Sequence, residues 1–377
     1  MPKVKAVKQK KEKQKRGKRS VTKPPRWFLT TFIVIGLTVL ALLWALPQLP
    51  RKPTVQPEVD YQGIIELWNV ESFEGGSGSR SSWLTNKSAK FESKHKGLFV
   101  HVTTLTTYEL EQKLQDGQTF DMICFSRGAG NLVKDRLIPQ TESVGFVRDN
   151  FMLSGQLDGK QYAVPLYAGA YCLFARAQQL NEEDLLSKAL TQTYSRKIGK
   201  TTIELSPLVC GYTDFNSPLT ALAMSGGRGN ANSLDESVTQ YQAYEQFVSN
   251  KSAVTLLGTQ RDLFRLNQRE SNGKIEQLSF APLYGYTDLV QYVGVSSSAC
   301  EKENACVEYI KYLLAEETQS ALTDISMFSV LEKSIYTSNA RYVACEQALT
   351  NAFVPNVFVD ADVIAGQRQT ARATLNI

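Results

Sequence analysis

An uncharged run of 20 residues, from Trp27 to Leu46, constrains this chain more than any other feature. At a rise of 1.5 Å per residue, about 20 apolar residues match the hydrocarbon thickness of a bilayer. A core helix of a globular domain would show a polar stripe, whereas this run is apolar all round. The run therefore predicts a transmembrane helix over residues 27–46, which Pro47 and Pro50 follow.

A cleaved signal peptide is the alternative interpretation of this run. Signal peptides carry an apolar region of about 7–15 residues that ends in small residues at a cleavage site. The run here is longer, and its end, ALPQLPRKP, offers no such site. We therefore favour an uncleaved anchor. No cysteine stands near its end, so the helix itself, rather than a lipidated cysteine, would hold the protein to the membrane.

The charge distribution predicts the orientation of the chain. Residues 1–26 contain 12 Lys and Arg residues and one acid. By the positive-inside rule this basic tail stays in the cytoplasm and the rest lies outside the cell. Beyond Lys52, 28 basic residues face 36 acidic ones. An exported domain of that acidity has no basic face for a nucleic acid, and the prolines of residues 47–60 predict a stiff spacer before it.

Strand-like and helix-like segments alternate after the spacer. Residues 64–70, 98–105 and 120–125 are apolar or β-branched runs, and helical segments at 79–94 and 108–114 separate them. This βαβαβ series predicts a parallel sheet with right-handed crossovers. Ligands of such sheets bind beyond the carboxyl ends of the strands. We therefore expect a site at the loops that follow these strands, at residues 71–78, after Thr104 and at 126–130.

Further elements are predicted along the rest of the chain. Residues 162–176 form a long strand-like run whose middle, Ala168-Gly169-Ala170, is small and flexible. The remaining predicted strands and one amphipathic helix lie at residues 253–257, 278–284, 290–296 and 303–314.

Motifs for catalysis are missing. Neither of the two histidines, His95 and His101, has a metal-ligand spacing, and the sequence has no nucleophile elbow and no phosphate loop. We therefore expect no enzyme activity, no metal and no cofactor. The loop at residues 75–81 follows the first strand and opens the first helix, but it lacks the third glycine of a dinucleotide fingerprint. Its backbone N–H groups can bind hydroxyls or an anion, or it is a flexible surface turn; both interpretations stay open.

Aromatic side chains gather at strand ends and in loops rather than along helix stripes. They are Trp68, Phe73, Tyr167, Tyr171, Tyr284, Tyr286 and Phe328. Aromatic faces pack against the C–H face of a sugar while nearby polar groups bind its hydroxyls. Core packing is the alternative for each ring.

The six cysteines are too few and too scattered for a disulfide framework. Cys124 and Cys172 lie in apolar runs, where we expect free buried thiols. Cys300 and Cys306 are close enough in sequence to leave a local disulfide open, because spacing alone does not establish its geometry.

Several segments resemble the extracellular solute-binding proteins of ABC importers, of the family that takes up sugars. The most specific is LDGKQYAVPLYAGAYCLFARAQQL, which is similar to the family pattern x-G-K-x-Y-A-x-P…L-x-Y-N-K-x-L. Other similar segments, in the same order as in the family, are IELWNVESFEG, SAKFESKHKGLFVHV, DGQTFDMICFSRG, SGGRGN, VSNKSAVTLLGTQ and SMFSVLEKSIY.

The resemblance implies a type II periplasmic-binding-protein-like fold, with two α/β lobes that close over a ligand by hinge motion. Lobe 1 would comprise residues 61–169 and 279–314, and lobe 2 residues 170–278 and 315–377. The implied function is a membrane-tethered receptor that delivers a carbohydrate-like solute to ABC permease subunits. The alternative is a tethered sensor or accessory protein that kept the fold without transport.

The binding residues that we predict come from strand ends and from the resemblance. They are Trp68, Glu71, Glu74, Ser126, Arg127, Tyr167, Tyr171, Gly227, Arg228, Arg261, Tyr284 and Phe328. The chain departs from the family where an aromatic residue follows N-G-P, because Gly258 is followed here by Thr259, Gln260 and Arg261. A cleft without that stacking ring suits a smaller or more polar ligand than a typical oligosaccharide.

Overall fold

The structure is a computed structural model that describes residues 37–38 and 61–377, except residues 143, 192–193, 212, 214, 229–237 and 250–252. Val59–Ile377 forms one compact unit. The predicted tail, anchor and spacer lie outside the described residues, apart from the helical Leu37 and Thr38. Within the described part of the chain, no helix has both the length and the apolar character that a membrane crossing needs.

The first lobe is built on a five-stranded sheet in the order β2-β1-β3-β12-β6. Its strands are β1 (Gly63–Val70), β2 (Leu98–Leu105), β3 (Met122–Ser126), β6 (Val164–Ala168) and β12 (Val290–Val295). The strand β1 pairs in parallel with β2 and β3, as the βαβαβ pattern predicts. The strand β12 runs antiparallel between β3 and β6, because it enters the sheet from the second lobe. The sheet is therefore mixed rather than wholly parallel.

Helices α2 (Arg80–Glu92) and α10 (Glu303–Leu313) pack against this sheet and against each other. The hydroxyls of Ser88 and Tyr309 lie 2.7 Å apart where the two helices meet. The remaining helical and hairpin elements of this lobe are α3 (Thr107–Gln115), α4 (Gly130–Val133), η2 (Lys134–Arg136), α5 (Asp149–Leu153), β4 (Gln156–Leu157), β5 (Lys160–Gln161), η3 (Ser297–Lys302), α11 (Glu316–Ser320) and η4 (Ala321–Ile325).

The second lobe has a five-stranded sheet in the order β11-β7-β10-β9-β8. Its strands are β7 (Tyr171–Arg176), β8 (Tyr194–Ile198), β9 (Thr201–Cys210), β10 (Ala253–Thr259) and β11 (Leu278–Pro282). The sequence pattern did not predict the β8–β9 hairpin. The helices of this lobe are α6 (Glu182–Lys188), α7 (Pro218–Met224), α8 (Gln240–Val248), α9 (Gln260–Ser271), α12 (Ala340–Leu349) and α13 (Ala361–Leu375).

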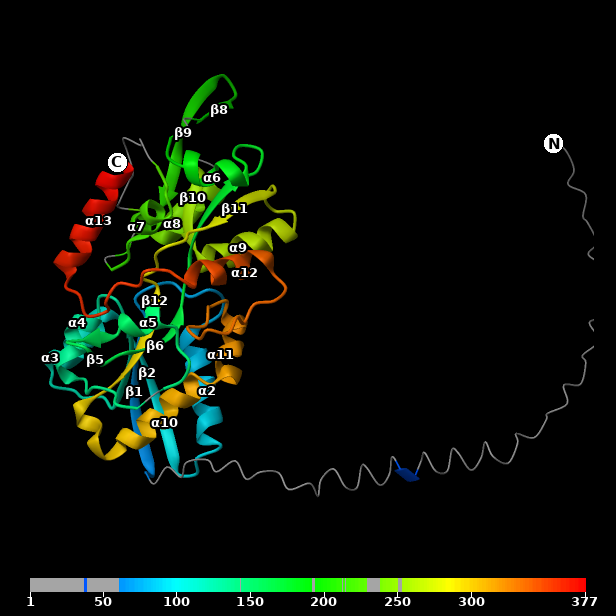
Figure 1. The fold of residues 1–377 in the computed structure, drawn as a ribbon. Helices are drawn as coiled ribbons and strands as arrows, with labels where there is room; N and C mark the ends of the chain where they lie inside the picture. The colour runs from blue at the N-terminus through cyan, green and yellow to red at the C-terminus, as the bar shows by residue number, and fades with distance from the viewer. Residues whose placement is uncertain are drawn as a thin grey trace, which may run out of the picture. The chain divides into compact units, whose positions relative to one another are not determined.

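The chain passes between the two lobes several times (Figure 1). Strand β6 leads into β7 through Gly169 and Ala170, the small and flexible stretch of the sequence. Residues 283–289 connect β11 to β12, and residues 326–339 connect η4 to α12. After α12 the chain returns to the first lobe, where Val357 N donates to Ser154 O at 2.9 Å, before α13 packs on α7.

The lobe boundaries differ from the predicted ones at two places. Strand β11 belongs to the second sheet, so that crossing follows residue 282 instead of preceding residue 279. The segment with α11 and η4 stays with the first lobe, because the Gln319 side chain donates to Leu166 O at 2.9 Å and Trp83 donates to Ala321 O at 3.2 Å. That boundary therefore lies near residue 326 rather than at 315.

All six cysteines are free thiols. Cys124 and Cys172 are buried, as their apolar surroundings predict. Cys300 is exposed while Cys306 is buried in α10, so these two form no local disulfide in this structure. The two sulfur atoms that do approach each other, at 3.4 Å, belong to Cys172 and Cys345.

Candidate functional site

A cavity of about 540 Å³ lies between the lobes, at the carboxyl end of β1. The first lobe contributes the loop that leads from β1 into α2, and the second lobe contributes side chains from three separate segments. The lining residues are Glu71, Ser72, Phe73, Glu74, Gly75, Gly78, Ser79, Arg80, Thr213, Gln240 and Arg261. We call this cavity the interlobe pocket. Its volume lies in the range of small-molecule sites.

The loop that lines the pocket is held in place by η4. Ser77 N donates to Ile325 O at 2.7 Å, and the hydroxyls of Ser77 and Ser326 lie 3.0 Å apart. A Cβ atom on Gly76 would lie 2.1 Å from Ser326 O, so only glycine allows this approach. The loop ends at Ser79, whose side chain accepts from Ser82 N and caps α2. The loop is thus a fixed part of the site rather than a flexible surface turn.

Arg80 is the most deeply buried charged residue of the pocket lining, with 4 % of its surface exposed. Its Nη2 donates to Phe73 O and lies 3.4 Å from Glu71 Oε2, and its guanidinium lies 4.5 Å from the Phe73 ring centroid. Its Nη1 has no hydrogen-bond partner. This atom is enclosed by protein atoms, and the guanidinium lies close enough to the buried Tyr167 hydroxyl to lower the pKa of that hydroxyl against the larger effect of burial.

The second lobe reaches the same loop through the start of α9. Gln260 accepts from Ala170 N at 3.1 Å and donates to Glu74 O at 2.7 Å. Arg261 Nη1 donates to Gly76 O at 2.9 Å. The two lobes are therefore in direct contact beside the pocket.

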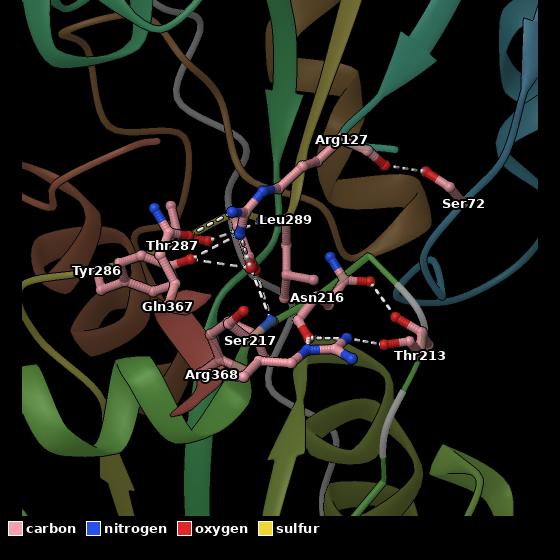
Figure 2. A network of polar contacts seen from close by, with 12 residues as sticks. Ser72, Arg127, Thr213, Asn216, Ser217, Tyr286, Thr287, Leu289, Gln367 and Arg368 are labelled. Atoms are coloured by element: carbon pink, nitrogen blue, oxygen red, sulfur yellow. Dashed lines mark hydrogen bonds and ion pairs between the residues drawn. The ribbon is translucent and has the colours of Figure 1, made fainter. Parts of the chain in front are cut away.

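A buried polar network, which we call the hinge network, joins the two lobes next to the pocket (Figure 2). Arg127, at the end of β3, places its Nη1 3.0 Å from Asp288 Oδ2 and 3.0 Å from the Tyr286 hydroxyl. Asp288 also accepts from the Tyr171 hydroxyl at 2.6 Å and from Ser217 N at 2.7 Å. Both charged side chains are almost fully buried, at 2 % and 0 % exposure.

The helix α13 completes this network from the second lobe. Gln367 accepts from Arg127 Nη2, and Arg368 Nε donates to Asn216 O at 3.1 Å. The loop after β3 is covered as well, because a Cβ atom on Gly128 would lie 2.2 Å from the Phe215 ring. This second predicted ligand loop is therefore closed by protein atoms and does not line the pocket.

Three of the predicted binding residues line the interlobe pocket: Glu71, Glu74 and Arg261. Their role in ligand binding stays a prediction. Two more, Arg127 and Tyr171, belong to the buried hinge network, and Ser126 hydrogen-bonds Ser72 next to it.

Most of the predicted stacking rings lie in the core, although Phe73 lines the pocket. Trp68 packs 5.0 Å from the Phe120 ring, and Tyr167 meets Trp83 edge-on at 6.0 Å. Burial raises the pKa of Tyr167. Phe328 is fully buried and packs 5.4 Å from Tyr336. The ends of these strands are buried, so an aromatic residue there fits core packing as well as stacking on a ligand.

The last three predicted residues lie away from the pocket. Gly227 is buried after α7, where its N donates to Leu222 O at 2.9 Å. Arg228 and Tyr284 are exposed. The pocket lining that the sequence did not single out includes Arg80, Thr213 and Gln240. Arg80 belongs to the loop at residues 75–81, which the sequence predicted to open a helix. No local sequence pattern indicated that Thr213 or Gln240 would line a pocket.

Asp262, in the first turn of α9, carries a buried carboxyl group. It is 2 % exposed and accepts from Thr259 N at 3.0 Å. Burial raises the pKa of the Asp262 carboxyl from 3.8 to about 7; the neighbouring Glu74 also raises this pKa, while Arg265 and Arg261 lower it.

We predict that Asp262 makes stability depend on pH between about 4 and about 7. The carboxyl ionises at lower pH in the unfolded chain than in the folded one, so its contribution is complete below pH 4 and is lost as the pH rises to 7. Over that window the loss is roughly 1.4 kcal/mol per pH unit. Urea unfolding at several pH values should show that the free energy of unfolding of the Asp262→Asn variant increases, relative to that of the unsubstituted protein, as the pH rises. A gap that stays constant with pH would contradict this assignment.

The fold matches solved structures of sugar-binding proteins. The chain resembles the GacH receptor of Streptomyces glaucescens, solved with acarbose, at 14 % identity and a TM-score of 0.57, over 84 % of this chain and 94 % of that one. It also resembles maltose-bound MalE3 of T. maritima (14 % identity, TM-score 0.58, 83 % and 95 % covered). MalE of Xanthomonas citri, described as a sugar-binding protein, gives 14 % identity and a TM-score of 0.57, over 83 % and 92 %.

No family profile matches the sequence, and no curated protein matches it either. At such low identity the structural likeness establishes the fold alone. The chain therefore has the mixed α/β, two-lobe fold of these sugar-binding proteins.

Proposed function

We propose that this protein is a membrane-tethered receptor that captures a polar, sugar-like solute between its lobes and delivers it to an ABC importer. The observation that carries the proposal is the interlobe pocket, whose lining comes from both lobes and includes eight polar or charged side chains. A ligand there would contact the β1–α2 loop on one side and Thr213, Gln240 and Arg261 on the other. Such a ligand stabilises the closed arrangement of the lobes over an open one.

Closure of the lobes about the hinge would supply the affinity for the solute and would also create the form that an importer recognises. The crossings at Gly169–Ala170 and at residues 283–289 are short connections about which the lobes can rotate, as in other hinge proteins. Arg261 and Gln260 touch the β1–α2 loop directly in this arrangement. An importer would recognise the closed form, because only that form presents both lobes in one fixed geometry. The sugar-binding proteins of the same fold support this proposal by analogy.

A tethered sensor or accessory protein is the second candidate. The direct hydrogen bonds from Gln260 and Arg261 to the first lobe favour it, because they hold the lobes together without a ligand. In a receptor of this kind the closed form would persist in the absence of solute, and solute would add little to its stability.

The proposal predicts that a small polar solute raises the melting temperature of the protein. A ligand at about 100 times its dissociation constant adds about 2.7 kcal/mol of stability, which is a shift of several degrees for a chain of this size. A screen of sugars, polyols, polyamines and amino acids measures it. Gln240→Trp, which places a large side chain in the pocket, should abolish the shift, and Gln112→Trp on the exposed face of α3 should preserve it.

A melting temperature that no solute changes would contradict the receptor proposal. A shift that survives Gln240→Trp would place the binding site outside the interlobe pocket.

The tether is part of the same proposal and rests on residues 1–60. The tether is supported by the uncharged 20-residue run that follows a basic tail. The full-length protein should sediment with membranes after a carbonate wash and keep Met1 or Pro2 as its first residue. A mature protein whose sequence starts beyond Ala45 would show a cleaved signal instead.

A further inference from the structure

Two buried cysteines from distant parts of the chain meet in the second lobe. The sulfur atoms of Cys172 and Cys345 lie 3.4 Å apart, although 173 positions separate the residues in the sequence. Both residues are fully buried. A disulfide bond is about 2.05 Å long, so the two sulfur atoms need to approach each other by only about 1.4 Å to form one. The fold therefore brings together a pair of thiols that oxidation can join.

Cys172 lies where two of the crossings between the lobes meet the second sheet. It is the second residue of β7, and the crossing at Gly169 and Ala170 directly precedes that strand. Cys172 pairs with Pro282, the last residue of β11, after which the crossing at residues 283–289 begins. On its other side Cys172 pairs with Gly258 of β10, the strand that leads into α9 beside the interlobe pocket.

Cys345 lies on the helix that receives the third crossing. It is near the middle of α12, which follows residues 326–339 and packs against β11. A bond between Cys345 and Cys172 joins α12 directly to β7, and β11 contacts both of these elements. The second-lobe ends of the three crossings then form one covalently linked base for the hinge.

We propose that Cys172 and Cys345 form a disulfide bond, which fixes the second-lobe ends of these three crossings to one another. The proposal takes the location of the domain outside the cell from the proposed function, because disulfide bonds form and persist in oxidising compartments. It gives neither cysteine a role in solute binding, since neither lines the interlobe pocket.

The oxidant that the reaction needs is another disulfide, carried by a thiol oxidase or by a small molecule such as glutathione disulfide. One cysteine of the pair, as a thiolate, attacks this disulfide, forms a mixed disulfide and releases the first thiol of the oxidant. The other cysteine then attacks the mixed disulfide and releases the second thiol. One bond between sulfur atoms breaks and one forms. The two cysteines lose two electrons and two protons, which the two released thiols carry away.

The reaction takes place while the second lobe is folding. Both thiols are inaccessible to an oxidase once β7 and α12 have packed. Burial, and after it the hydrogen bond with Cys345, raises the pKa of the Cys172 thiol in the folded protein, so little of the reactive thiolate is present there. The same burial protects the bond from external reductants once it has formed.

Peptide mapping of the full-length protein tests the proposal. The protein is extracted from membranes in the presence of N-ethylmaleimide, denatured, and digested with trypsin without reductant. Cleavage after lysine and arginine leaves Cys172 in residues 161–176 and Cys345 in residues 342–368. We expect these two peptides as one species, whose mass is two hydrogen atoms below the sum of the separate peptides and which reduction splits.

Recovery of the two peptides separately, each with N-ethylmaleimide on its cysteine, would overturn the proposal. A disulfide from Cys172 or Cys345 to any of the other four cysteines would overturn it as well. Neither outcome affects the receptor proposal, which solute binding tests. A linked pair of peptides in a protein that binds no solute would leave this inference standing while the receptor proposal fails.

Melting curves with and without dithiothreitol measure what the bond does for the fold. A disulfide that closes a long loop restricts the unfolded chain, so the reductant should lower the melting temperature by several degrees. Cys172→Ala should melt at the same temperature with and without dithiothreitol. Cys124→Ala, which removes an equally buried thiol from the first lobe, should keep the dependence on the reductant.

Each variant is compared with itself, so a cavity that the substitution leaves does not alter the result. A melting temperature of the unsubstituted protein that dithiothreitol does not change would contradict a bond that stabilises the base of the hinge.

Discussion

The ion pair between Arg127 and Asp288 sets the geometry on which the rest of the structure depends. Asp288 lies on the crossing from β11 to β12 and also accepts from Ser217 N of the second lobe, while Arg127 directly follows β3 of the first. Both charges are withdrawn from water, and removing one partner of such a pair typically costs about 3–5 kcal/mol. The pair requires the two lobes and the crossing to meet in one arrangement, and the interlobe pocket exists in that arrangement.

The hinge network also determines what the pocket can bind. Tyr171 and Tyr286 both direct their hydroxyls at Asp288, and Tyr167, Trp68 and Phe328 pack in the core, so none of these rings lines the pocket. Apart from Phe73 and two glycines, the interlobe pocket is lined by residues with carboxylate, guanidinium, hydroxyl or amide side chains. Such a lining distinguishes ligands by charge and hydrogen bonding, whereas stacking on aromatic faces would tolerate many neutral sugars.

The sequence predicted the elements whose residues follow a clear period. Residues 98–105 form β2 because a β-branched run favours an extended chain, and residues 303–314 match α10 because their apolar residues share one helix face. The β8–β9 hairpin lacks such a pattern. In the site, Glu71 and Glu74 were found because they follow a buried strand. Pocket residues from remote segments, such as Thr213 and Gln240, are brought there by tertiary contacts that no local pattern records.

The central claim, that both lobes bind one solute in the interlobe pocket, is tested most directly by hydrogen–deuterium exchange. The measurement compares amide exchange in the free protein and in the presence of the solute that gives the largest melting shift. The account predicts slower exchange at residues 71–82 of the first lobe together with residues 239–242 and 259–262 of the second. Slower exchange in one lobe alone, or only at residues away from these three segments, would contradict it.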